Sequence, residues 1–401
     1  MQIALIADTF PPLRTSGAVQ LRDLARAFAA EGHDVTVILP SAGLVGAWTL
    51  EQVEGYRVLR LRAPRIKDIG YLRRTIGEFI MPFAMLRNLR RSPLSKSRWD
   101  GIVWYAPSIF FGPIVKKLKT SSRCRGYLIV RDIFPEWAVD MGLMRRGLTY
   151  RFFSAIAHYQ YDVADVIGVQ TKGNRQYFAA WQVGKARRLE VLQNRLADIA
   201  VSPCSISIEK SKFAGRKVLV YAGNMGVAQG VGVFLELAAR LRGRPDIGFL
   251  FVGRGSDAKA LDADARARGL ENVLFYDEIH PDEIPGLYAQ CAVGLLALDP
   301  RHRSHNIPGK FLTYLQAGLP VLAVVNRGND LKEMIEHHRV GRVLECAEPD
   351  ELLPLALDMI DAKAKDPGIS GRCRELFRKH FLPEIAVRQI TRALSQSDGG
   401  P

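Results

Sequence analysis

Short runs of continuously apolar residues alternate with helical patterns along the whole chain. Clear examples are residues 3–7 of the strand expected at 2–7, and residues 127–130, 218–222, 292–298 and 320–325. A strand that is covered on both faces needs apolar side chains on both, and strands that alternate with helices form parallel sheets. The sequence therefore predicts an α/β protein, and its length of 401 residues predicts two domains.

A polar segment divides the chain. Residues 197–217 lack the strand-helix alternation, are rich in serine and lysine, and contain Pro203. Segments of this kind connect domains. Since the alternation is the same before and after the segment, we expect a Rossmann-like domain on each side of it.

The stretch from residue 304 to residue 321 has the order of a binding site. A strand precedes it, Asn306 suits a helix cap, Pro308 suits a first helical turn, and Gly318 suits the helix end. Ligands of open α/β sheets bind outside the carboxyl ends of the strands. The N–H groups of a helix start, together with Lys310, are suited to a phosphate group.

Other strands of the second half end in similar loops, at residues 223–230, 253–257 and 277–280. Glycine in such a loop lets backbone N–H groups reach a phosphate. Because the loops of parallel strands share one sheet edge, we expect them to converge on a nucleotide-sized site. Arg254 and Lys310 would neutralise a diphosphate, and the backbone of residues 276–279 would meet a base.

Two loops of the first half are candidates for a second substrate. Ser16 and Gly17 precede the helix expected at residues 18–30, where Gly17 either admits a ligand or relaxes a turn. Asp132 follows the strand at residues 127–130 and is a candidate to accept a proton or orient a hydroxyl group. The alternative is that Asp132 and Glu136 only cap the following turn or pair with Arg131.

A basic segment from residue 65 to residue 98 contains an amphipathic pattern. Its apolar side chains recur at spacings of four, three, four and three residues, at Leu72, Ile76, Phe79, Phe83 and Leu86. The pattern is too short to span a bilayer. It predicts either a helix in the headgroup region of an anionic leaflet, or a helix packed on its domain with a solvated basic face and a kink at Pro82. The membrane alternative predicts contacts from Arg73, Arg74, Phe79, Phe83, Arg87, Arg90 and Arg91.

The whole chain carries 56 basic and 41 acidic residues, for a net charge of +15. An anionic membrane, phosphorylated substrates or a general arginine bias would each account for this charge. We expect no nucleic-acid partner, because no motif of that kind accompanies the charge. The five scattered cysteines predict a reducing compartment without a structural metal, and the N-terminus reads as a strand, not as a signal peptide. The expected location is the cytoplasm.

Five motifs together resemble one enzyme family. They are residues 223–230 (GNMGVAQG), 307–310 (IPGK), 317–321 (AGLPV), 131–136 (RDIFPE) and 32–35 (GHDV). In their order along the chain they resemble the retaining GT-B glycosyltransferases of family 4, and among these the bacterial fucosamine-transferase-like enzymes of surface polysaccharide and lipopolysaccharide synthesis. His305 and Thr313 stand near the places where the broader family has two glutamates eight residues apart.

The resemblance implies an acceptor-binding domain at residues 1–197 and a nucleotide-sugar-binding domain at residues 198–378, facing each other across a cleft. Residues 379–401 would form a helix that returns to the first domain. The implied donor-binding residues are Gly223, Asn224, Gly226, Gln229, Gly253, Arg254, Asp277, Glu278, Ile279, Asn306, Ile307, Pro308, Gly309, Lys310 and Thr313. The implied acceptor-binding residues are Ser16, Gly17, Arg131, Asp132 and Glu136.

The implied reaction moves a sugar from a nucleotide diphosphate, expected to be UDP, onto a lipid-linked saccharide at the inner leaflet, with retention of anomeric configuration. Asp132, Lys310 and Arg254 are the expected catalytic residues, and no cofactor or metal is expected. The missing glutamates leave two alternatives open. One is a catalytically silent nucleotide- or lipid-binding partner, and the other is a sugar-nucleotide epimerase.

Overall fold

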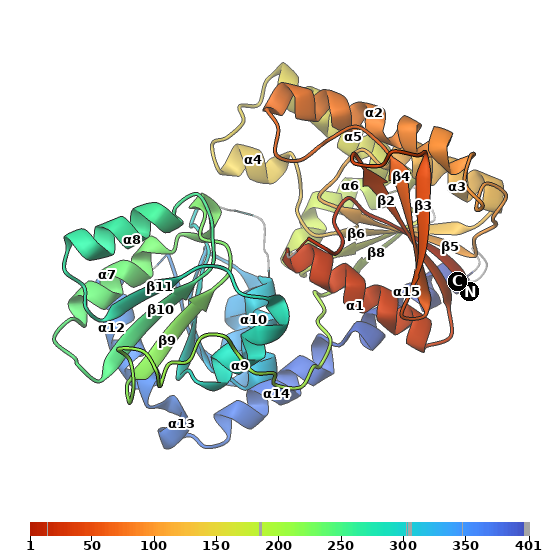
Figure 1. Cartoon of the computed structure of the whole chain (residues 1–401). Helices are drawn as coiled ribbons and strands as arrows, with labels where there is room; N and C mark the ends of the chain where they lie inside the picture. Colours follow the sequence, from red (N-terminus) through yellow and green to blue (C-terminus); the bar gives the residue numbers. More distant parts are fainter. Residues whose placement is uncertain (14, 184–186, 302, 304–306, 347, 397–401) are drawn as a thin grey trace. The chain divides into compact units, whose positions relative to one another are not determined.

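The computed structural model describes residues 1–13, 15–183, 187–301, 303, 307–346 and 348–396 (Figure 1). The chain forms two compact units. The first contains residues from Met1 to Arg195 and from Pro383 onward, and the second contains Leu196–Leu382. The units thus divide after Arg195 and after Leu382, beside the boundaries at 197 and 378 that the sequence suggests.

The first unit is built on an eight-stranded sheet with the strand order β3-β4-β2-β1-β5-β6-β7-β8. Its strands are β1 (Gln2–Ile6), β2 (Asp34–Ser41), β3 (Trp48–Val53), β4 (Tyr56–Arg62), β5 (Gly101–Ala106), β6 (Arg125–Val130), β7 (Val166–Val169) and β8 (Arg188–Val191). Its α-helices are α1 (Ser16–Ala30), α2 (Tyr71–Leu89), α3 (Gly112–Ser122), α4 (Glu136–Asp140), α5 (Leu148–Val163), α6 (Ala179–Gln182) and α15 (Pro383–Ser395).

One edge of this sheet corrects the expectation of purely parallel strands. β3 pairs with β4 in the antiparallel sense, and their hairpin was missed by the sequence analysis. The turn is made by Glu54 and Gly55, which both have positive φ angles, of 44° and 86°. A two-residue turn of this kind is usually marked by Asn-Gly or Asp-Gly, so Glu-Gly gives a weaker signal.

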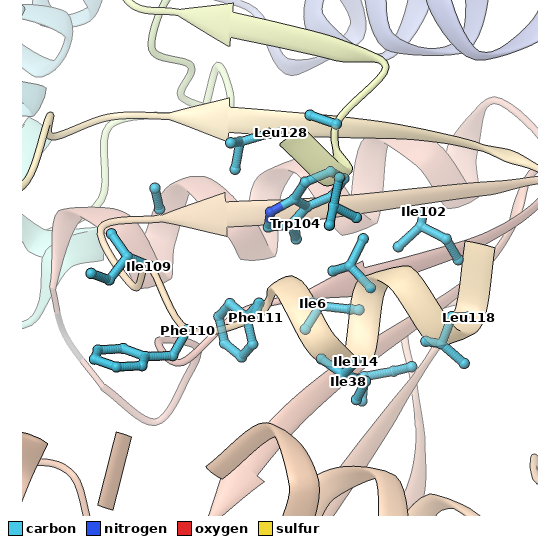
Figure 2. Close-up of a cluster of buried hydrophobic side chains, with 14 of the residues drawn as sticks. Ile6, Ile38, Ile102, Trp104, Ile109, Phe110, Phe111, Ile114, Leu118 and Leu128 are labelled. Carbon is cyan, nitrogen blue, oxygen red and sulfur yellow. The ribbon is translucent and has the colours of Figure 1, made fainter. Parts of the chain in front are cut away.

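Helices cover both faces of the sheet. Successive side chains of a buried strand point to opposite faces, so apolar side chains on each face need a covering layer. In β5, Ile102 and Trp104 join one hydrophobic cluster, whereas Val103 and Tyr105 join another. Figure 2 shows the first cluster around Trp104, which packs against α3. The second cluster lies under α1 and α15, which contact each other.

The second unit has a six-stranded sheet in the order β11-β10-β9-β12-β13-β14, in which every pair is parallel. Its strands are β9 (Lys217–Ala222), β10 (Ile247–Val252), β11 (Val273–Tyr276), β12 (Val293–Ala297), β13 (Val321–Val325) and β14 (Gly341–Glu345). Its α-helices are α7 (Gly232–Arg240), α8 (Ala258–Ala267), α9 (Ile284–Ala289), α10 (Gly309–Ala317), α11 (Asp330–His338), α12 (Pro349–Ile360), α13 (Ala362–Lys365) and α14 (Ile369–His380). The strand order reverses between β9 and β12, and ligands of open α/β sheets bind at such a point.

Helix α2 packs on the first unit with a different face from the one that its apolar periodicity predicts. Its buried residues include Gly77, Glu78, Met81 and Met85. A Cβ atom at residue 77 would lie 2.8 Å from the backbone oxygen of Arg65, so glycine allows this close approach. Four residues of the predicted apolar face, Leu72, Ile76, Phe79 and Phe83, are instead at the surface. The fifth, Leu86, is partly buried against the hydrophobic cluster.

This packing predicts opposite stability effects for two neighbouring positions of α2. Met81→Ala should lower the free energy of unfolding by about 2–5 kcal/mol, because the side chain is fully buried. Phe79→Ala should change it by less than about 1 kcal/mol, because the ring is 50% exposed. Urea denaturation of both variants measures the difference. A larger loss for Phe79→Ala would show that α2 packs by its other face.

Candidate functional site

The loops after β9 and β10 lie backbone against backbone. The Gly223 amide donates to the Val252 carbonyl at 2.8 Å, and the Gly253 amide donates to the Tyr276 carbonyl at 3.0 Å. A Cβ atom at residue 253, where φ is +141°, would lie 2.0 Å from the Gly223 oxygen. Only glycine fits at this position, and its presence brings three loops together at one sheet edge.

Side chains within the first loop fix its shape. The Gln229 Oε1 atom accepts hydrogen bonds from Asn224 Nδ2 at 2.8 Å and from the Gly226 amide at 3.1 Å. The hydroxyl group of Tyr221 donates to the Asn224 carbonyl at 2.6 Å. Asn224 and Gln229, which the sequence predicts to bind a donor, therefore also hold the loop in its conformation.

Lys310 lies at the centre of this edge. Its Nζ atom is 3.7 Å from the ring centroid of Tyr221 and donates to the hydroxyl group of the same residue. The Lys310 Cε atom lies 3.6 Å from the place that a Cβ atom of residue 223 would occupy. Tyr221 is fully buried, and burial raises its pKa, so its partner is a neutral phenol.

The ammonium group of Lys310 has no acidic partner among the residues that the structure describes. Burial lowers the pKa of this amine to about 7. An anion bound at this place would favour the charged form of the amine and raise its pKa again. The site thus combines an amine whose pKa is near neutral pH with glycine-rich loops. This combination suits a diphosphate.

Helix α10 begins two residues later than the cap predicted at Asn306 implies. Pro308 is the N-cap residue, and the first helical residue is Gly309. The backbone N–H groups at the start of a helix have no partner within the helix, and here they belong to the segment that carries Lys310. The Thr313 hydroxyl donates to the Lys310 carbonyl at 2.9 Å, and Ile307 is buried. Asn306 and His305 lie outside the described residues.

Arg254 forms an ion pair with Glu278, with 2.6 Å between Nε and Oε2. Both belong to the predicted donor site, but the sequence did not indicate that they pair with each other. The Arg254 side chain is 68% exposed. An exposed pair of this kind contributes at most about 1 kcal/mol, so Arg254 can exchange Glu278 for another anion at low cost.

Two residues of this edge are not among the predicted site residues. Tyr221, in β9, contacts the ammonium group of Lys310 with its ring. The sequence feature that could have indicated this role is an aromatic residue near the end of a buried strand. Asp299 is buried and accepts from Arg301 Nε at 2.9 Å and from Nη2 at 2.7 Å. A Cβ atom at Gly230 would lie 3.5 Å from the Asp299 Cα atom, so the two loops meet at the reversal of strand order. The sequence feature that could have indicated Asp299 is its place directly after the apolar run 292–298.

The first unit brings together part of the predicted acceptor site. Arg131 donates from Nη1 to the Tyr105 hydroxyl at 3.2 Å and from Nη2 to the Ser16 hydroxyl at 3.3 Å. Gly17 lies beside them, since its Cβ atom would be 3.3 Å from the Tyr105 oxygen. Asp132 directly follows Arg131 at the carboxyl end of β6.

Glu136 is engaged elsewhere in the first unit. Its Oε1 atom accepts a hydrogen bond from the Tyr150 hydroxyl at 2.7 Å, and its Oε2 atom lies 3.7 Å from Arg146. These contacts tie α4 to the start of α5. In the described part of the chain, no three His, Cys, Asp or Glu side chains are grouped to hold a metal ion, and no helix is long and apolar enough to cross a membrane.

Two family models match the chain. Residues 16–195 match "Glycosyl transferase 4-like domain", and residues 216–361 match "Glycosyl transferases group 1". The two matches follow the two units. The chain belongs to the GT-B glycosyltransferases of family 4, as the motifs predict.

Known proteins agree with this assignment. WcaI of Escherichia coli K12, named as a colanic acid biosynthesis glycosyl transferase, is 24% identical over 97% of this chain and 98% of its own. A sucrose-phosphate synthase of Thermosynechococcus elongatus superposes with a TM-score of 0.75 at 14% identity, covering 98% of each chain. HepE of Anabaena, solved with UDP and glucose, superposes with a TM-score of 0.69 at 16% identity, covering 98% of this chain and 100% of its own. At these identities the two structures show the fold, which is GT-B.

For the UDP that the sequence analysis expects as part of the donor, the position of Lys310 predicts how binding depends on pH. The amine has a pKa of about 7 and gains a proton when an anion binds, so the affinity should fall about tenfold for each pH unit above 7. Isothermal titration calorimetry from pH 7 to pH 9, in buffers of different ionisation enthalpy, measures both the affinity and the proton uptake. Lys310→Met should bind weakly and without this dependence. An affinity for UDP that is constant over this range would show that Lys310 does not meet the diphosphate.

Proposed function

We propose that this glycosyltransferase moves a sugar from a UDP-linked donor onto a lipid-linked saccharide during bacterial surface polysaccharide synthesis, with retention of anomeric configuration. The observation that carries the proposal is the Lys310 ammonium group, which lies without an acidic partner among the described residues beside the glycine-rich loops. The UDP complex of HepE and the polysaccharide role named for WcaI support the substrate class. The narrower likeness to fucosamine transferases stays a prediction.

In this reaction negative charge grows on the departing diphosphate. Fixed N–H donors and cations that already point at this charge lower the barrier, because they need no reorganisation during the reaction. Lys310, the start of α10 and the loop at residues 223–226 would supply them. We expect no metal requirement, since these groups can provide the positive charge on their own.

The acceptor hydroxyl would attack on the face from which the diphosphate leaves. An oxygen of the departing phosphate would then accept the hydroxyl proton, and Asp132 would orient the hydroxyl group. Arg254 would leave Glu278 and contact the diphosphate, since their exposed pair is weak. The proposal thus gives each of the three predicted catalytic residues a separate role.

Helix α2 supports a membrane location for the acceptor. Leu72, Phe79 and Phe83 form an exposed apolar stripe, and Arg73 and Arg87 are exposed beside it. This arrangement suits the headgroup region of an anionic leaflet, where apolar side chains insert and arginines meet lipid phosphates. Arg74 would contribute less to membrane binding than the sequence suggests, because it pairs with Glu78 at 2.9 Å.

Turnover tests the catalytic part of the proposal. Lys310→Met should lower kcat/KM about 10²–10³-fold, because one fixed donor to the leaving group is lost. Its melting temperature should not fall, because a partly buried charge is removed together with its desolvation cost. The matched control is Lys332→Met, which removes an exposed lysine that pairs with Glu345 at 3.7 Å.

The same assay separates the alternatives. Release of UDP that needs an acceptor supports a transferase. Interconversion of the donor without an acceptor would identify an epimerase. Absence of turnover with a full panel of donors and acceptors would identify a silent binding partner, and full activity of Lys310→Met would exclude the proposed role of this lysine.

Flotation with liposomes tests the membrane part. The variant Phe79→Ser/Phe83→Ser and the variant Arg87→Glu/Arg90→Glu should each lose at least about tenfold in binding to vesicles with anionic lipid, since each removes two membrane contacts. The control is Arg266→Glu on α8 of the second unit, which should float like the wild type. Equal flotation of all four proteins would contradict a membrane role for α2.

A further inference from the structure

Helix α5 carries an exposed apolar stripe. Leu148, Phe152 and Tyr159 are 83%, 45% and 39% exposed. Ala155, which lies between the last two, is exposed as well. Spacings of four, three and four residues place these side chains on one face of the helix. The turn before the helix adds Leu143, which is also at the surface.

The opposite face of α5 packs on the first unit. Ala157, Gln160 and Tyr161 are buried there, and Phe153 packs against the hydrophobic cluster around Trp104. Helix α5 is therefore held on its unit without the exposed stripe. A group of apolar side chains at the surface of a protein marks a contact with a partner or a membrane.

The surface around the stripe is positively charged. Arg145, Arg146 and Arg151 are exposed, and residues 141–161 contain no aspartate or glutamate. Arg146 lies 3.7 Å from Glu136 of α4. The charge of this segment stays positive when Glu136 is counted with it.

Helix α5 belongs to the same helical layer as α2. Helix α3 contacts both α2 and α5, and all three helices pack into the hydrophobic cluster around Trp104. Helices that cover one face of a sheet turn their outer sides in the same direction. Helix α3 adds the exposed Lys116 and Lys117, and the Lys116 Nζ atom lies 5.9 Å from the ring centroid of Tyr159. The apolar stripes of α2 and α5 thus lie on one side of the first unit, together with these lysines.

We propose that the outer surface of residues 143–159 is a second membrane-binding element, which inserts the apolar stripe of α5 into an anionic leaflet. Arginines and lysines around an apolar stripe meet lipid phosphates while the apolar side chains enter the acyl boundary. A second copy of this chain fits the surface less well, because a symmetric contact would place positive charge against positive charge. The inference deepens the membrane part of the proposed function and uses an observation that is independent of α2.

Two stripes on separate helices also fix an orientation. A single stripe leaves the protein free to turn about the axis of its helix, whereas two stripes hold one face of the first unit against the leaflet. Binding strength grows with the apolar area that enters the membrane, so each stripe adds to the affinity.

Flotation of the full chain with vesicles of phosphatidylcholine and phosphatidylglycerol tests the inference. Leu148→Ser/Phe152→Ser and Arg145→Glu/Arg151→Glu should each lose at least about tenfold in binding, since each removes two membrane contacts. The melting temperatures of both variants should stay near that of the wild type, because the replaced side chains are exposed. The control Val201→Ser, which removes an exposed apolar side chain of the second unit, should float like the wild type.

A tryptophan in the stripe reports directly whether α5 enters the lipid. Phe152→Trp should add fluorescence that lipids with brominated acyl chains quench, whereas the fluorescence added by Val201→Trp should not be quenched. Unquenched emission from residue 152, or flotation of Leu148→Ser/Phe152→Ser equal to that of the wild type, overturns the inference. A loss of dimers in this variant without a loss of flotation also overturns it, because the surface would then bind a second copy.

Failure of this inference is distinguishable from failure of the proposed function. The membrane role of α2 is tested by Phe79→Ser/Phe83→Ser, and the transfer reaction is tested by Lys310→Met. Neither test involves a residue of α5.

Discussion

The second unit depends on the contact between two loop backbones at Gly253 and Gly223. A Cβ atom at residue 253 would lie 2.0 Å from the Gly223 oxygen, so any other residue would force the loops after β9 and β10 apart. Their separation would also move the Tyr276 carbonyl, which accepts from the Gly253 amide. The positions of the backbone N–H groups around Lys310 therefore depend on the absence of a side chain at Gly253.

Lys310 is a partly buried cation whose charge is not matched by an acid among the described residues. Its ammonium group lies on the phenol ring of Tyr221. Folding alone disfavours this arrangement, because a partly desolvated charge is left without an ion pair. Sites that bind anions accept this cost, since the ligand supplies the missing negative charge.

Much of the fold could be predicted from the sequence, because buried parallel strands need apolar side chains on both faces. The runs at residues 218–222 and 292–298 became β9 and β12 for this reason. The hairpin β3–β4 was missed, since its edge strand β3 is partly exposed and its turn is Glu-Gly. Helix α2 was found as a helix, but periodicity does not tell which of two apolar faces packs, and Gly77 decided it.

The candidate site was predictable where its groups are set by the backbone. Gly223, Gly253 and Lys310 follow from strand-loop-helix order, and the structure brings them together. Partners that depend on side-chain packing were not predictable. The contact of Tyr221 with Lys310 and the pair of Arg254 with Glu278 both join residues that are far apart in the sequence.

Hydrogen–deuterium exchange in the presence of UDP tests the central claim most directly, because it reports which backbone N–H groups the nucleotide contacts or orders. The account predicts slower exchange in the second unit at residues 223–229, 253–257, 276–279 and 307–310. Slower exchange confined to the first unit, or to α12 and α14 of the second, would contradict the placement of the donor at Lys310.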